Sequence, residues 1–144
     1  MVAVSEHLAG ARLAARASEA MAVPLQHALG AQLLDQGEPT VGAWFRVEHL
    51  ATNGAGGLHA AALAAVLELA GYLALLPHLG VDEHAVTHAV ATQLVAAARE
   101  GQRVEVRGEV DRRARRVAFL SVVATVEDRT IARAQLTKSI VEFR

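Results

Sequence analysis

The chain has 144 residues, a length that fits one domain with a core of its own. Apolar residues make up 53% and charged residues 20%, which excludes a disordered chain, and the net charge of −1 gives no basis for binding nucleic acid or an anionic membrane. There is no cysteine, which excludes disulfides, thiol nucleophiles and cysteine-ligated metals.

The N-terminal part predicts a helix over residues 5–20, with Ser5 as its N-cap and Pro24 as its limit. Glu6 lies where a secretory signal would need basic or apolar residues, and no apolar block of signal length follows it. We therefore expect a cytoplasmic protein with one domain over 1–144, in which 1–22 is a helical extension.

Residues 25–47 predict two strands. The turn signal Gly37-Glu38-Pro39 divides two apolar runs, as in a hairpin. Trp44 and Phe45 are expected to be packing residues of the second arm. The glycine-rich segment 53–57 then predicts a loop.

The most apolar segment, residues 58–76, predicts a helix because alanine and leucine dominate it. Its length also raises the possibility of a membrane span. Glu68 at its centre, His59 near its start and the lack of flanking positive charge oppose that possibility. We therefore expect a helix surrounded by protein and no membrane partner.

The second half of the chain predicts strands over 102–111, 117–126 and 131–143, and a weaker one over the alanine-rich 85–97. One long helix with five or six strands indicates an α+β fold in which a curved antiparallel sheet wraps around the helix. The side of the helix that the sheet leaves open favours a partner subunit, and hence a homodimer.

Glu68 is the strongest candidate for chemistry. Its neighbours are apolar, and no lysine or arginine occurs between residues 50 and 98, so a local ion pair is excluded. A carboxylate in such surroundings is costly unless it is paired, lies at a subunit boundary or is needed chemically. His59 lies nine residues earlier, about 13 Å away along a helix and on roughly the opposite face. Both could act on one atom only from two chains.

The spacing of Asn53, His59 and Glu68 resembles that of hotdog-fold acyl-CoA thioesterases of the PaaI-like type. In that family an Asn or Gln lies six residues before a His-Gly-Gly, and an acid lies nine residues after the His. The resemblance implies a hotdog fold, dimers or tetramers with sites between subunits, and hydrolysis of an acyl-CoA without metal or other cofactor. In this chain Ala60 and Ala61 replace the two glycines, which narrows the approach to the thioester.

The resemblance also implies roles for the matching residues. Glu68 would be the general base or the nucleophile, and the backbone N–H of Ala60 would bind the oxyanion. His59 would fix the loop and the acyl carbonyl, and Asn53 would orient water or the carboxylate. Further substrate contacts are expected from Gly57, Ala61, Tyr72, Arg113 and Arg115.

Arg113 and Arg115 belong to a run of four arginines at 112–116, where the functional interpretation is contact with the coenzyme A phosphates and the alternative is a solvated turn. His84 and His88 have an i, i+4 spacing that could bind a metal on a helix. Because no third ligand accompanies them, we expect no metal site.

Three other functions stay open on the sequence alone: a lyase that hydrates or dehydrates an acyl thioester, a non-catalytic acyl-CoA-binding protein, and a small membrane or interaction protein built on the 58–76 helix. Product analysis, binding without turnover, and recovery as a soluble dimer would separate them.

Overall fold

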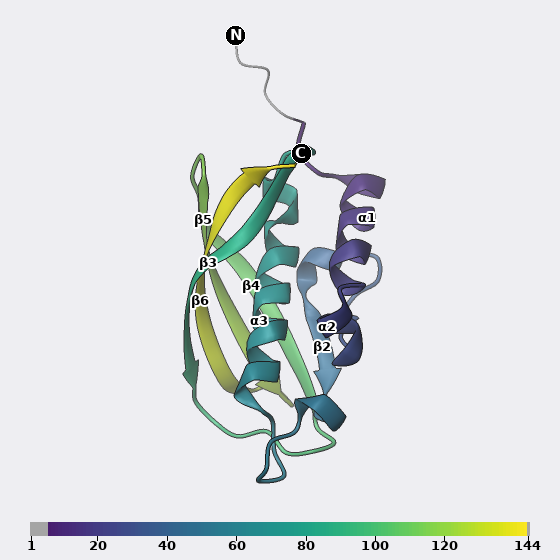
Figure 1. The fold of residues 1–144 in the computed structure, drawn as a ribbon, viewed down its shortest axis with the longest axis vertical. Coiled ribbons are helices and arrows are strands. Elements are labelled where there is room, and N and C mark those ends of the chain that lie inside the picture. Colours follow the sequence, from purple (N-terminus) through teal and green to yellow (C-terminus); the bar gives the residue numbers. More distant parts are fainter. Residues whose placement is uncertain (1–5, 144) are drawn as a thin grey trace.

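The computed structural model describes residues 6–143 (Figure 1). The helices are α1 (Gly10–Met21), α2 (Pro24–Ala28) and α3 (Ala60–Leu75), and short 3-10 turns lie at Pro39–Val41, His49–Ala51 and Leu76–His78. The strands are β1 (Gln32–Leu33), β2 (Ala43–Arg46), β3 (Glu83–Leu94), β4 (Arg103–Arg113), β5 (Val117–Val126) and β6 (Arg129–Glu142).

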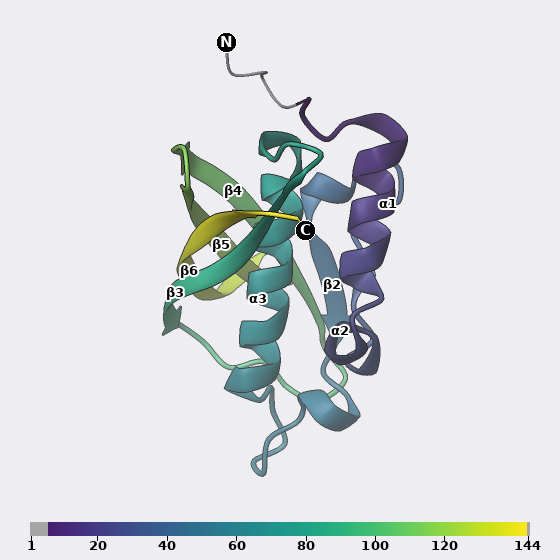
Figure 2. The same cartoon turned by 45° about the horizontal axis from the view of Figure 1, so that its top comes forward.

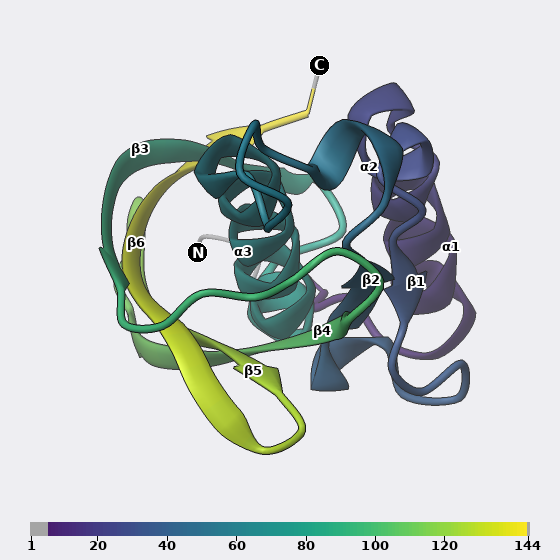
Figure 3. The same cartoon turned by 90° about the horizontal axis from the view of Figure 1, so that it is seen from below.

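All six strands form one antiparallel sheet in the order β1-β2-β4-β5-β6-β3. The sheet curves around α3, and α1 and α2 lie beside α3 near β1 and β2 (Figures 2 and 3). This is the hotdog fold with an additional N-terminal helix, as the sequence predicts.

Small residues let α3 lie close to the sheet. A Cβ on Gly108 of β4 would stand 2.7 Å from the carbonyl oxygen of Ala70, and a Cβ on Gly71 would stand 2.5 Å from Leu136. A side chain at Gly108 would therefore push β4 away from the helix, and one at Gly71 would displace the side chain of Leu136. The largest side chains that are fully buried in the core between them include Phe45, Leu67, Leu73, Leu120, Ile131 and Leu136.

The apolarity of α3 reflects this burial. The stretch Ala60–His78 has the length and mean hydropathy, 1.8, of a membrane-spanning helix, but 72% of it is buried inside the fold. Core helices of soluble proteins have the same property.

The N-terminal part differs from the sequence prediction. α1 begins at Gly10 instead of residue 5, with Ala9 as its N-cap, while Ser5 lies outside the described residues. A strand was predicted to begin at residue 25, but that prediction is wrong because α2 occupies this position. Proline at the first position of a helix has a suitable φ and needs no hydrogen-bond acceptor, so Pro24 begins a new helix instead of only ending one. The predicted hairpin is confirmed as β1 and β2.

β3 lies at the edge of the sheet and pairs only with β6. Its residues 86–94 are exposed, including Val90 at 44% and Leu94 at 59%. Within residues 6–143 the other edge of β3 has no strand beside it. A long, apolar, open edge of this kind is a template for pairing with another strand.

Candidate active site

A groove of about 550 Å³ runs along α3 between β3 on one side and the N-terminal helices on the other. Apolar side chains form most of its wall, as in sites that bind acyl chains. The groove also contains six polar side chains: Gln26 of α2, Glu68 and Tyr72 of α3, His84 and Thr87 of β3, and Lys138 of β6.

Glu68 is half-buried in this groove. Within the described residues no hydrogen bond or ion pair engages its carboxylate. The acid that the sequence singles out is therefore neither fully enclosed in the core nor neutralised by a salt bridge. Both of its oxygens remain available to water or to a ligand in the groove.

Lys138, the only lysine of the chain, is buried in the same groove with 4% of its surface exposed. Its ammonium donates to Oγ1 of Thr87 at 3.0 Å and lies 5.7 Å from the centre of the Tyr72 ring. Burial lowers the pKa of Lys138, and the negative charge of Glu68 opposes this shift. The groove thus contains both the candidate acid and a buried ammonium, and the two form no ion pair with each other.

Tyr72 is also buried, and its hydroxyl lies 3.0 Å from Nδ1 of His84. Burial raises the pKa of Tyr72, with a smaller opposing effect of Arg16. Burial lowers the pKa of His84, and the charges of Arg16 and Lys138 lower it further against the opposing effect of Glu19. Both shifts favour the neutral forms, which can share one hydrogen bond between the Tyr72 hydroxyl and Nδ1 of His84.

The start of α3 lies at the other end of the groove. His59 is the N-cap residue, and its Nδ1 accepts a hydrogen bond from the backbone N–H of Ala61 at 3.0 Å. The preceding N–H, that of Ala60, has no acceptor among residues 6–143 and is exposed. Ala60 and Ala61 both have helical geometry, so neither position requires glycine.

Asn53 organises the loop before this helix. Its Oδ1 accepts from the N–H groups of Ala55 and Gly57 at 2.8 and 3.0 Å, and its Nδ2 donates to the carbonyl of Leu58 at 3.3 Å. Gly57 lies so close to Ala98 that a Cβ would stand 2.8 Å from its carbonyl oxygen. Asn53 therefore holds the loop that positions the helix start, and within this chain its polar atoms face the loop itself.

The two arginines predicted to bind phosphate have different surroundings. Arg113 forms an ion pair with Glu83 at 2.7 Å and also donates to the carbonyls of His78, Ala114 and Arg115. Its guanidinium is thus already engaged by the protein. Arg115 is exposed in the β4–β5 connection, which lies at the opposite end of α3 from the start of this helix (Figure 1).

His84 and His88 are both on strand β3, where four residues span about 13 Å, so the helical spacing argument does not apply to them. His88 lies at a bulge and contacts Oγ of Ser139 at 3.1 Å. In the part of the chain that the structure describes, no group of three or more His, Asp or Glu could hold a metal ion.

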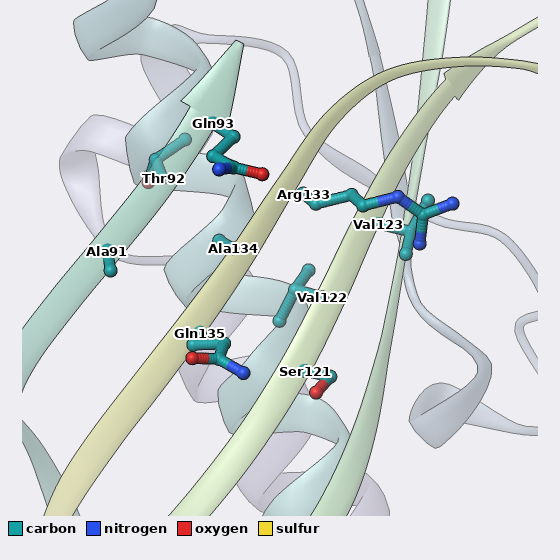
Figure 4. Close-up of a pocket in the computed structure, with 9 residues that line it drawn as sticks. All are labelled: Ala91, Thr92, Gln93, Ser121, Val122, Val123, Arg133, Ala134 and Gln135. Carbon is teal, nitrogen blue, oxygen red and sulfur yellow. The ribbon is translucent and has the colours of Figure 1, made fainter. Parts of the chain in front are cut away.

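A second cavity, of about 460 Å³, lies on the outer face of the sheet over β3, β5 and β6 (Figure 4). Thr92, Gln93, Arg133 and Gln135 contribute its polar side chains, together with Ser121, whose hydroxyl donates to Asp111 at 2.6 Å. No carboxylate or histidine lines it. The groove along α3 is therefore the better candidate for catalysis.

Residues 57–144, which include the helix start, Glu68 and Lys138, match the family described as fluoroacetyl-CoA-specific thioesterase. The chain belongs to this thioesterase family. No protein of curated function matches it in sequence.

Solved structures of thioesterases share the fold. A thioesterase of Haemophilus influenzae is 19% identical with a TM-score of 0.79, over 96% of this chain and 94% of that one. A variant of the phenylacetic acid degradation protein PaaI of Thermus thermophilus is 22% identical with a TM-score of 0.71, over 81% and 98% of the two chains. A hypothetical thioesterase of Streptococcus pneumoniae, solved with coenzyme A, is 17% identical with a TM-score of 0.64, over 71% and 81%. This likeness confirms the hotdog fold that the sequence predicts.

Sequence analysis of this thioesterase-family chain did not assign four polar groove residues to the site: Gln26, His84, Thr87 and Lys138. The position of Lys138 could have been predicted from the sequence. It lies on the same side of a strand as Leu136 and Ile140, and these two apolar residues face inward. His84 was considered only as a metal ligand. The sequence does not indicate that Gln26 reaches the groove, because this residue lies in α2, where a strand was predicted.

Proposed function

We propose that the protein hydrolyses acyl-CoA thioesters at two equivalent sites, each shared by two copies of the chain. The observation that carries the proposal is the Glu68 carboxylate, half-buried in an apolar groove and without a partner among residues 6–143. Membership of a thioesterase family supports the reaction class.

The open edge of β3 supports the sharing of sites. Ala85, near the start of β3, lines the groove together with Glu68 and Tyr72. Leu94, near the other end of the strand, lines a smaller cavity with Ala60. Antiparallel pairing of β3 with β3 of a second copy would therefore bring the start of one α3 toward the middle of the other. It would also cover the exposed apolar residues of β3.

In such a dimer the Glu68 carboxylate takes a proton from a water molecule whose oxygen attacks the thioester carbonyl carbon. The carbonyl oxygen becomes negative and accepts a hydrogen bond from the backbone N–H of the partner subunit's Ala60, because the N–H of Ala60 has no acceptor within the described part of the chain. The C–S bond then breaks, and the thiolate leaves with the proton that Glu68 received. Direct attack by the carboxylate is the alternative route.

Coenzyme A as the thiol is supported by its presence in the structure of the Streptococcus pneumoniae thioesterase of the same fold. Of the two arginines predicted to contact its phosphates, Arg115 is exposed and suited to this role, whereas Glu83 and three carbonyls already engage Arg113. Arginine suits phosphate because its planar fork of N–H groups can donate two parallel hydrogen bonds.

The proposal is tested with a panel of acyl-CoA substrates that includes short, branched, aromatic and fluoroacetyl groups, with detection of the released thiol. We expect turnover of at least one member and loss of that turnover in Glu68→Gln. Binding without release of thiol would indicate a non-catalytic acyl-CoA-binding protein, and a modified acyl group on an intact thioester would indicate a lyase.

A further inference from the structure

Gln26 of α2 is the most unusual polar residue of the groove. It is 9% exposed, and its Nε2 donates to the carbonyl oxygen of Ala65 at 3.0 Å. Its Oε1 is the one buried side-chain oxygen or nitrogen without a hydrogen-bond partner among the described residues. A buried acceptor without a donor destabilises a fold, so native proteins rarely contain one without water or a ligand beside it.

The orientation of the Gln26 amide follows from its partner. The carbonyl of Ala65 can only accept hydrogen bonds, so the NH₂ group must face it and Oε1 must face away. In an α-helix the N–H of Leu69 already donates to this carbonyl, so α3 does not need Gln26 to satisfy it. The amide is therefore held by one end while its acceptor end faces a ligand groove.

The position of Oε1 relates it to the candidate acid. Ala65 precedes Glu68 by three residues, which corresponds to a rise of about 4.5 Å on the same side of a helix. A thioester whose carbonyl carbon lies at Glu68 would place atoms three or four bonds from that carbon within reach of Gln26. A thioester of coenzyme A carries an amide N–H at this distance on the thiol side. Some acyl groups carry a hydroxyl at this distance on the other side.

We propose that Gln26 is a substrate-binding residue whose Oε1 accepts a hydrogen bond from an N–H or O–H of the thioester, about one helical turn from the reacting carbon. This inference rests on the proposed thioesterase function. It also makes the N-terminal helices part of the active site, since Ala20, Val23 and Leu25 line the groove beside Gln26. These residues precede residues 57–144, the segment that matches the thioesterase family. The contact between Gln26 and the substrate would therefore come from a part of the chain outside the matched segment.

The test compares wild type with Gln26→Met, which has a similar length but no acceptor, and with Gln36→Met, a control in an exposed loop. The substrates are butyryl and 3-hydroxybutyryl thioesters, each on coenzyme A and on ethanethiol, which lacks the amide. The measured quantity is kcat/KM for the four substrates.

If the donor is the acyl hydroxyl, wild type prefers the hydroxybutyryl thioesters and Gln26→Met reduces this preference by about tenfold on both thiols. If the donor is the amide N–H, Gln26→Met lowers kcat/KM by about tenfold for both coenzyme A thioesters and leaves the ethanethiol pair unchanged. Equal effects on all four substrates, or no effect on any, would overturn the inference and assign Gln26 a structural role.

Thermal unfolding of each variant shows whether it is folded. Should Gln26→Met not fold, Gln26→Asn, which keeps the amide and withdraws the oxygen by one methylene, is compared on the same four substrates. If wild type turns over no thioester at all, the proposed function fails together with the inference. If wild type is active and the ratios in the Gln26 variants stay unchanged, the inference alone fails.

Discussion

Nη2 of Arg113 donates to both carboxylate oxygens of Glu83, at 2.9 and 2.7 Å, and so links the end of β4 to the start of β3. The two side chains are 21% and 22% exposed, and Oε1 of Glu83 also accepts from the N–H of Gly80. In this contact an arginine that the sequence suggests for phosphate binding stabilises the fold.

Arg113→Ala should therefore lower the free energy of unfolding by about 1–3 kcal/mol, because it leaves a half-buried carboxylate without its cation. Arg115→Ala, in the exposed connection, should leave stability within about 0.5 kcal/mol of wild type. Urea unfolding of both variants measures the difference. Equal stabilities would show that the ion pair contributes nothing.

Lys138→Met should stabilise the protein and impair catalysis. Methionine fills a similar volume without the cost of burying an ammonium, so the melting temperature should rise, by about 3–5 °C for each kcal/mol gained. The substitution also removes the ammonium that donates to Oγ1 of Thr87 in the groove, so kcat/KM should decrease. An unchanged kcat/KM together with a lower melting temperature would contradict this account of Lys138.

His84 should make stability depend on pH. Its pKa in the folded chain is lowered from 6.5, so below this pH the unfolded chain takes up the proton first. The free energy of unfolding should therefore decrease as the pH falls from 6.5 toward the folded pKa, and this contribution should vanish above 6.5. Urea unfolding at several pH values should show a shallower decrease in His84→Gln and the full decrease in His88→Gln. The same slope in all three proteins would rule out His84 as its source.

Asn53→Ala removes the side chain that binds two N–H groups and one carbonyl of the loop before α3. We expect a loss of about 1–3 kcal/mol in stability and a lower kcat, because the loop no longer fixes the helix start. Asn53→Asp keeps the acceptor for the N–H groups of Ala55 and Gly57, and it should therefore lose less stability and less kcat than Asn53→Ala. Wild-type stability and kcat in Asn53→Ala would show that the loop is held by other contacts.

The sequence is sufficient to predict the strands of the second half, because the alternation of apolar and polar residues along them indicates which side faces the helix. Val104 and Val106, which alternate with charged residues in the sequence, are buried, and α3 is recognised because its apolar residues continue around the whole helix. The N-terminal part is harder to predict. Pro24 is compatible with the end of one helix and the beginning of another, and only packing against α3 decides between them.

The residues of the candidate site also differ in whether the sequence predicts them. Asn53, His59 and Glu68 are found from their spacing because they lie within one loop and one helix. Gln26 and Lys138 reach the groove from elements that are distant in the sequence, and their role depends on tertiary contacts. A single chain also cannot specify which groups a second copy contributes to the groove.

The sharing of one site by two chains is tested by two variants that each remove one function. Glu68→Ala removes the acid. Ala60→Pro removes the N–H proposed for the oxyanion, at the first position of a helix, where proline is well tolerated and where His59 already has the extended backbone that precedes proline. Each variant alone should be folded and should lose about 100-fold or more in kcat.

The two variants, carrying different affinity tags, are then co-expressed and the heterodimer is purified through both tags. If Glu68 acts with the partner subunit's Ala60, one of the two sites in this heterodimer contains neither substitution, and about half of the wild-type activity should return. If both groups act within one chain, every site remains defective and no activity returns. Recovery near half supports the shared site, and its absence in a folded heterodimer contradicts it.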